Sequence, residues 1–303
     1  MFNKREILNR KQHAGLRFAT GKGFGFAANL MSIPAVSAEV EHMAREYVIV
    51  FDREQTQMHA LLGSAQAFNG YVNDHNQWLA RYIPANIRAY PFSPAVIAGQ
   101  ETSSEGKHQV AITLDPEAPQ FNDANGELII DEQGKPTELF DKVQNAITSL
   151  YQDSIRTSQQ IAQLNALGLL IERPIEIKRN KVSLDGFRII DTDRLSQLSS
   201  SDLATLRDSG ALMLIYGHLI SLSNVKDSPV VRIPKTETIE PTANVTAIQE
   251  KDFFTDEDFN LDFSKFQSCL DHGLQQCVIA PVNYYSYCRL FEPDPMLRSN
   301  TAA

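Results

Sequence analysis

The sequence predicts an α+β fold: a mostly antiparallel N-terminal sheet, a helical half after it, and a C-terminal extension. Short apolar runs bounded by charged or turn residues recur between about residues 47 and 131, which is typical of strands. Apolar residues then recur at helical spacing after residue 137. Strands that precede helices, rather than alternate with them, favour the α+β class.

Residues 1–35 are polar and contain glycines, so we expect a flexible N-terminal arm. We expect the α+β domain over 36–228 and a linker over 229–250, where Thr, Pro and Glu are frequent. Residues 251–303 would form the C-terminal extension.

The elements expected in the first half are a short helix and several short strands. The helix falls at 39–46, and the strands at 47–51, 58–63, 68–72, 109–114 and 128–131. Asn69 and Gly70 supply turn residues that tolerate a positive φ. Pro84, Pro91 and Pro94 limit any helix near them to a turn or two.

The clearest helix is expected between Thr137, a plausible N-cap, and Gly168, a stop signal. A strand pair follows at 169–177 and 182–190, around the basic turn at 178–181. Asp191 and Ser199 are expected to cap two further helices. Residues 211–223 fit a buried helix by length, although a buried strand fits the same apolar run.

The composition restricts the function classes. The chain has 303 residues, 43% of them hydrophobic, which is enough for a sizeable core. Its net charge of −9 disfavours nucleic-acid binding. No stretch approaches the ~20 apolar residues of a membrane-spanning helix, and no secretory signal begins the chain. With an odd count of three Cys, we expect a soluble cytoplasmic protein with reduced thiols, with non-classical export as the alternative.

The block 76–92 is the most distinctive segment because aromatic, cationic and proline residues alternate in it. Aromatic rings stack on sugars or other rings, and arginines hold carboxylates or phosphates. The alternative is a cluster at the edge of the core, in which arginine stacks on aromatic rings. The candidate ligand-binding residues of the block are Trp78, Arg81, Tyr82, Arg88, Tyr90 and Phe92.

His218 is a further candidate, because Ser221 would share its helix face. A Ser/His pair would need an orienting acid such as Asp185 or Asp191, and no nucleophile-elbow motif is present. A core histidine that bonds to the backbone fits the apolar surroundings better.

We expect no metal and no cofactor. The acidic stretch 256–262 departs from a calcium loop, since Leu261 occupies the position of the required glycine. The residues Cys269, His272, Cys277 and Cys288 have irregular spacing for zinc. The same region carries several phenylalanines among acidic residues, which fits either a docking segment for a partner or a tail packed on its own domain.

Several segments in a fixed order resemble the bacterial SapC family, whose name refers to a surface layer. They are Glu39 with 45–51, the block 78–92, and the segments 128–137, 185–191, 210–212 and 218–222. The resemblance extends over about residues 30–228 and implies no catalytic residue.

The sequence therefore favours a SapC-like accessory or binding protein that recognises a protein partner or a small polar ligand through the block. One alternative is an enzyme with a cleft lined by Arg81, Arg88 and His218. Another is a surface-layer component that is exported by a non-classical route. The oligomeric state is left open.

Overall fold

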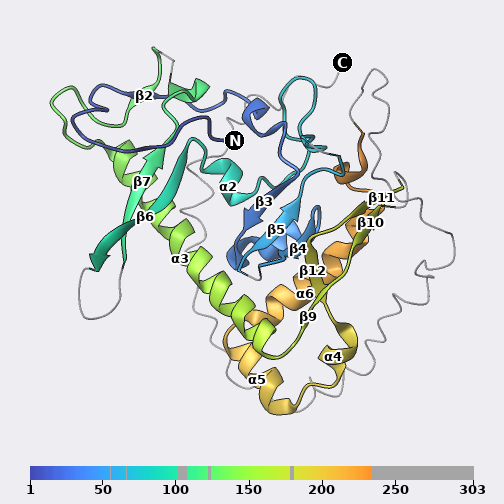
Figure 1. The fold of residues 1–303 in the computed structure, drawn as a ribbon. Helices are drawn as coiled ribbons and strands as arrows, with labels where there is room; N and C mark the ends of the chain where they lie inside the picture. Colours follow the sequence, from blue (N-terminus) through green and yellow to red (C-terminus); the bar gives the residue numbers. More distant parts are fainter. Residues whose placement is uncertain (55, 66, 102–107, 122–123, 178–180, 234–303) are drawn as a thin grey trace. The chain divides into compact units, whose positions relative to one another are not determined.

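The computed structural model describes residues 1–54, 56–65, 67–101, 108–121, 124–177 and 181–233. This part of the chain contains antiparallel sheets and α-helices, so the predicted α+β class is confirmed (Figure 1). The predicted extension over 251–303, most of the predicted linker and most of the basic turn at 178–181 lie outside the described residues.

The main sheet has five antiparallel strands that come from both halves of the described chain. Their order is β3 (Ser32–Ala35), β5 (Met58–Leu61), β4 (Val48–Asp52), β12 (Phe187–Ile190) and β9 (Leu170–Glu172). The central strand β4 reads Val-Ile-Val-Phe-Asp, and its four apolar residues are fully buried. Such a continuous apolar run is expected of a strand that is covered on both faces.

Three smaller sheets are also antiparallel. The three-stranded sheet has the order β1 (Glu6–Ile7), β7 (His108–Leu114) and β6 (Phe92–Glu101). The pairs are β2 (Arg17–Phe18) with β8 (Glu127–Leu128), and β10 (Ile175–Ile177) with β11 (Val182–Leu184). Strands β1 and β2 therefore tie the N-terminal segment to residues that lie about a hundred positions later.

The helices are short except for one. They are α1 (Val40–Met43), α2 (Ala85–Arg88), α3 (Glu138–Ala166), α4 (Thr192–Ser196), α5 (Ser200–Asp208) and α6 (Ala211–Ser221). Thr137, Asp191 and Ser199 cap α3, α4 and α5 with their side chains, as the sequence predicts. The apolar run after Gly210 is the helix α6 rather than a strand.

Helix α3 joins two hydrophobic clusters. Val143, Ile147 and Leu150 in its first half pack in a cluster with Phe18, Phe92 and Phe121. Ile161 and Leu164 in its second half pack in the larger cluster, which includes the five-stranded sheet, α1 and α6. Figure 1 shows α3 passing from β6 and β7 toward α5 and α6. The amphipathic stripe of one helix therefore covers two separate cores.

Some sequence predictions were wrong or incomplete. Residues 68–72 form no strand; instead, Asn69 directs a turn by accepting the N–H of Tyr71 and donating to the carbonyl of Ala27. The sequence did not predict strand β6, because Pro94 lacks the N–H that a strand uses for pairing. The proline is tolerated because β6 is an edge strand of its sheet.

Both ends of the described chain contact the core. The first 35 residues, expected to form an arm, contribute β1, β2 and the edge strand β3. The 3-10 helix η6 (Pro229–Val231) lies where the linker was expected to begin, and Val230 and Val231 are buried. Secondary structure is therefore present on both sides of residues 36–228 within the described chain.

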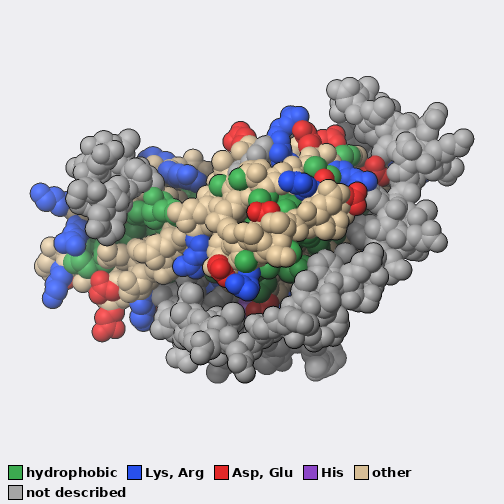
Figure 2. Space-filling view, turned by 90° about the horizontal axis from the view of Figure 1, so that it is seen from below, with side chains coloured by type: hydrophobic (Ala, Val, Ile, Leu, Met, Phe, Trp, Pro, Cys, Tyr) green, Lys and Arg blue, Asp and Glu red, His purple; other side chains and the backbone are tan. Residues whose placement is uncertain are grey.

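The described helices include none that is both long enough and apolar enough to cross a bilayer. On the face seen in Figure 2, Lys and Arg side chains are interspersed with Asp and Glu side chains and with apolar groups. The charges of that face do not gather by sign.

Candidate functional site

Trp78 is part of a stack of aromatic rings at the edge of the core. Its ring lies parallel to that of Tyr71 at 6.0 Å and edge-on to Phe24 at 5.5 Å. Its Nε1–H donates a hydrogen bond of 2.8 Å to the hydroxyl of Tyr47, which in turn donates to the carbonyl of Tyr82. Tyr47 is fully buried, and burial raises the pKa of its hydroxyl well above the usual value. Trp78 thus fastens the block to Tyr47, the residue before β4, through neutral hydrogen bonds.

Tyr82 and Arg88 surround a buried carboxylate, Glu39. One Glu39 oxygen accepts the N–H of Val36 at 3.0 Å, and the other accepts the N–H of Ala85 at 2.7 Å and the Tyr82 hydroxyl at 3.0 Å. Burial raises the pKa of Glu39, and these hydrogen bonds with the nearby Arg88 charge oppose the rise. The carboxylate therefore connects the residues before α1 to the start of α2.

Arg88 is held in place by three contacts. Its Nε donates to the carbonyl of Ile83 at 2.9 Å, and its Nη2 donates to the Tyr82 hydroxyl at 3.1 Å. Its guanidinium also lies 5.4 Å from the centroid of the Tyr82 ring, while His42 stacks on that ring at 5.2 Å. In this arrangement the Arg88 guanidinium stacks on an aromatic ring of the block and bonds to its backbone.

Arg81 differs from Arg88 because its side chain is 98% exposed. Its backbone N–H donates to a Glu46 carboxylate oxygen at 2.7 Å, whereas its guanidinium lies 3.9 Å from the other oxygen. The backbone bond fixes the turn, and the side chain extends into solvent.

Tyr90 and Phe92 face the second hydrophobic cluster. The Tyr90 ring stacks on Phe26 at 4.0 Å, and its hydroxyl donates to Asp115 at 3.2 Å. Burial and the neighbouring Asp115 charge raise the pKa of Tyr90. Phe92 is 1% exposed and lies edge-on to Phe121 at 5.7 Å. Both residues support the core beneath a cleft that is described below.

His218 is fully buried and bonds to two strands. Its Nδ1–H donates to the carbonyl of Ile49 in β4 at 2.7 Å, and its Nε2 accepts the N–H of Ile190 in β12 at 3.2 Å. Burial lowers the pKa of His218 to about 4. This neutral ring is the arrangement expected of a core histidine.

Ser221 does not activate His218 and is not activated by it. Its hydroxyl donates to the His218 carbonyl at 2.6 Å and accepts the N–H of Ile49 at 2.9 Å. Both side chains of the suspected pair therefore fasten α6 to the centre of the sheet.

The structure brings Tyr82 and Arg88 together around Glu39, but it does not bring Arg81 or His218 to them. Arg81 lies at the surface, and both ring nitrogens of His218 are engaged with backbone. From the sequence, Glu39 was expected only as part of the family resemblance, and Tyr47 was not predicted as part of the site. The available signal was an acid with apolar neighbours on both sides, Ala38 and Val40, because a buried carboxylate needs polar partners.

Two cavities adjoin the block. The larger, about 460 Å³, is lined by the N-terminal segment 1–5, by Ser32, Ile33 and Pro34 of β3, and by Leu30, Asn86, Phe92 and Ser93. The smaller, about 240 Å³, is lined by residues that include Arg45, Glu46, Leu79 and Ala80. The first cavity, hereafter the N-terminal cleft, was missed because its lining comes from four distant segments.

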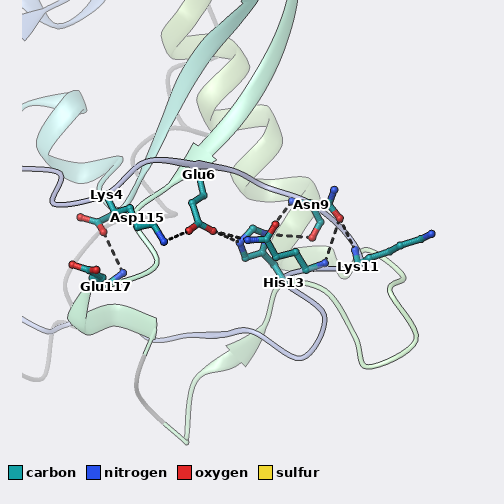
Figure 3. A network of polar contacts seen from close by, with 8 residues as sticks. Lys4, Glu6, Asn9, Lys11, His13, Asp115 and Glu117 are labelled. Carbon is teal, nitrogen blue, oxygen red and sulfur yellow. Dashed lines mark hydrogen bonds and ion pairs between the residues drawn. The ribbon is translucent and has the colours of Figure 1, made fainter.

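Figure 3 shows the polar network beside the N-terminal cleft. Glu6 lies between Lys4 and His13, and the ammonium of Lys4 is 2.5 Å from a Glu6 oxygen. Asp115 accepts the N–H of Asn3 at 2.8 Å. These contacts hold the first residues of the chain against the turn that follows β7.

The described residues contain no group of three or more His, Cys, Asp or Glu side chains arranged to hold a metal ion. The calcium-like stretch 256–262 and the residues Cys269, His272, Cys277 and Cys288 lie outside the described part of the chain.

The geometry thus defines an α+β protein with a fastened aromatic block and a small cleft beside it. A model of the SapC family matches residues 8–227, which is more than half of the chain. The chain therefore belongs to the SapC family. Neither a curated protein nor a solved structure matches it.

Proposed function

We propose that this SapC-family chain is a binding protein without a catalytic role, and that it takes a small ligand in the N-terminal cleft. The observation that carries the proposal is the lining of this cleft. Apolar residues such as Ile33 and Phe92 lie beside polar ones such as Asn86 and two cations, Lys4 and Arg5. A volume of about 460 Å³ falls within the range of small-molecule sites.

The block contributes to this site as a support more than as a contact surface. Asn86 and Phe92 line the cleft directly. Trp78 bonds to Tyr47, and Tyr82 bonds to Glu39. Arg88 bonds to the carbonyl of Ile83, and together these bonds hold the block in position. A rigid second layer of this kind keeps a pocket formed in the absence of its ligand.

The geometry supports the enzyme alternative less well. An active site needs several ionisable groups that converge on one cavity. Neither cavity is lined by Arg81, Arg88 or His218. A cytoplasmic location and a role in envelope physiology remain predictions from the sequence and the family name.

The proposal is tested by screening the full chain for small molecules that raise its melting temperature. Ser93→Tyr would place a ring in the N-terminal cleft, and Ala80→Tyr is the matched change in the smaller cavity. We expect ligands that stabilise the wild type and Ala80→Tyr but not Ser93→Tyr. Ligands that still stabilise Ser93→Tyr, or a broad screen without any stabilising ligand, would contradict the proposal.

A further inference from the structure

The N-terminal cleft has an apolar floor. Leu30 and Phe92 line it together with Ile33 and Pro34 of the edge strand β3. Pro34 lacks an N–H, so this edge offers few backbone donors to a peptide strand. The floor therefore suits the apolar body of a small molecule better than an added strand.

The polar groups at the inner end of the cleft already have protein partners. Asn86 Nδ2 donates to the carbonyl of Pro34 at 2.9 Å, and the Ser93 hydroxyl bonds to that of Thr113 at 2.9 Å. The Ser32 hydroxyl lies 3.3 Å from His59 Nδ1, and burial lowers the pKa of His59. The charge that a ligand meets must come from the cationic groups of the N-terminal segment, which are the Met1 amino group, Lys4 and Arg5.

Of the two cationic side chains, Lys4 has its charge balanced within the protein. Its ammonium is turned toward Glu6 at 2.5 Å (Figure 3). The hydrogen bond from Lys4 lowers the pKa of Glu6, which stays ionised at neutral pH. Lys4 is therefore a weaker partner for an added anion.

Arg5 has no carboxylate partner among the described residues, and the described lining of the cleft contains neither Asp nor Glu. Its guanidinium lies 4.5 Å from the centroid of the Phe2 ring. Phe2 in turn packs edge-on against Tyr90 at 5.3 Å, and Tyr90 stacks on Phe26. A guanidinium that stacks on a ring keeps its N–H edges available, and their fork matches a carboxylate.

We infer that the ligand of the N-terminal cleft is a small amphipathic monocarboxylate, whose carboxylate binds Arg5 and whose apolar body lies on half-buried apolar residues of the lining such as Leu30 and Pro34. This inference rests on the proposed function and adds the ligand class and the recognising residue. Arg5 is a side-chain cation of the lining without a carboxylate partner among the described residues, which suits a ligand with a carboxylate group.

Calorimetry on the full chain tests the inference with octanoate and with 1-octanol, which has the same chain without the charge. We expect octanoate to bind more tightly than octanol. Arg5→Gln should weaken octanoate at least about ten-fold, the loss expected when charge-assisted hydrogen bonds are removed. Lys4→Gln, the matched neutralisation next to it, should weaken octanoate by less than about three-fold. Because Lys4 and Arg5 are both exposed, and an exposed ion pair such as Lys4–Glu6 adds little stability, both variants should keep the wild-type melting temperature.

Two results would overturn the ligand class: equal binding of octanol and octanoate, or unchanged octanoate binding by Arg5→Gln. If either of these results is found while octanol binds and Ser93→Tyr abolishes that binding, the cleft is a ligand site and only the carboxylate assignment fails. If neither probe binds while other molecules from the screen bind in the cleft, the ligand class is again wrong and the proposed function stands. A screen in which no molecule binds would contradict both the ligand class and the proposed function.

Discussion

Single polar side chains in this protein bridge segments that lie far apart in the sequence. Glu39 bonds to Ala85, Ser221 to Ile49, and Asn224 to the carbonyls of Ala44 and Tyr47. A buried polar group without such partners would be costly, so these contacts specify which elements meet. In the sequence, residues of this kind resemble a catalytic set. In the structure, their side chains stabilise the fold.

The two arginines of the block provide a matched test at the residue scale. We expect Arg88→Ala to lower the free energy of unfolding by about 1–3 kcal/mol, because it removes two hydrogen bonds and a stacking contact. Arg81→Ala, at a 98% exposed side chain, should change it by less than about 0.5 kcal/mol. Urea unfolding measures both. Equal effects of the two changes would contradict the structural role of Arg88.

His218 gives a pH dependence whose sign follows from its burial. Its pKa is about 4 in the folded protein against an ordinary value of 6.5, so the unfolded chain takes up the proton first as the pH falls. The contribution of His218 to stability is therefore present above pH 6.5 and is lost as the pH falls toward 4. We expect a loss on the order of 2–3 kcal/mol over that interval.

The control for this prediction is His218→Gln, which carries no titrating group. We expect the variant to be less stable than the wild type at pH 7 and to show a smaller loss between pH 6.5 and 4. Unfolding at a series of pH values measures the difference, which isolates His218 from Glu39 and other acids. Parallel curves for the two proteins would show that His218 is not the source.

At the scale of elements, the close approach of α1 and α6 depends on Gly217. A Cβ at this position would lie 2.0 Å from Cγ1 of Val40, which is fully buried and stiff because of its branching. We expect Gly217→Ala to cost about 1–3 kcal/mol by overpacking, despite the higher helix propensity of alanine.

A double-mutant cycle tests this contact. Val40→Ala removes the clashing methyl groups, so Gly217→Ala should cost less in that background than in the wild type. Stability is measured by urea unfolding for the four proteins. Additive effects would indicate that α1 and α6 separate freely and that the contact does not limit their distance.

For the molecule as a whole, the structure indicates where a shortened chain should end. Val230 and Val231 are buried in the main hydrophobic cluster, and Arg232 donates to the carbonyl of Gly70 at 2.6 Å. We expect a chain that ends after Asp227 to be less stable, by about 3 kcal/mol or more, than one that ends after residue 233. Thermal and urea unfolding of the two chains measure the difference. Equal stability would mean that η6 adds nothing to the core.

The candidate site was predictable only in part, because local sequence patterns do not show which distant residues lie together in the fold. The sequence identified the block 78–92 as unusual, and two of its residues line the N-terminal cleft. The sequence did not indicate a role for Arg5, because residues 1–35 were expected to form a polar, flexible arm. Strand β1 is only two residues long, and its pairing with β7 is a long-range contact without a local signature.

Local chemistry determined several of the elements of this protein. Apolar periodicity predicted α3, side-chain caps predicted the starts of α3, α4 and α5, and an apolar run predicted β4. Only the tertiary structure decided that β12 pairs with β4, that His218 bonds to both strands, and that the first five residues line a cleft. Helical spacing and capping act within a few residues, whereas strand order and buried polar pairing are set by which distant segments share the core.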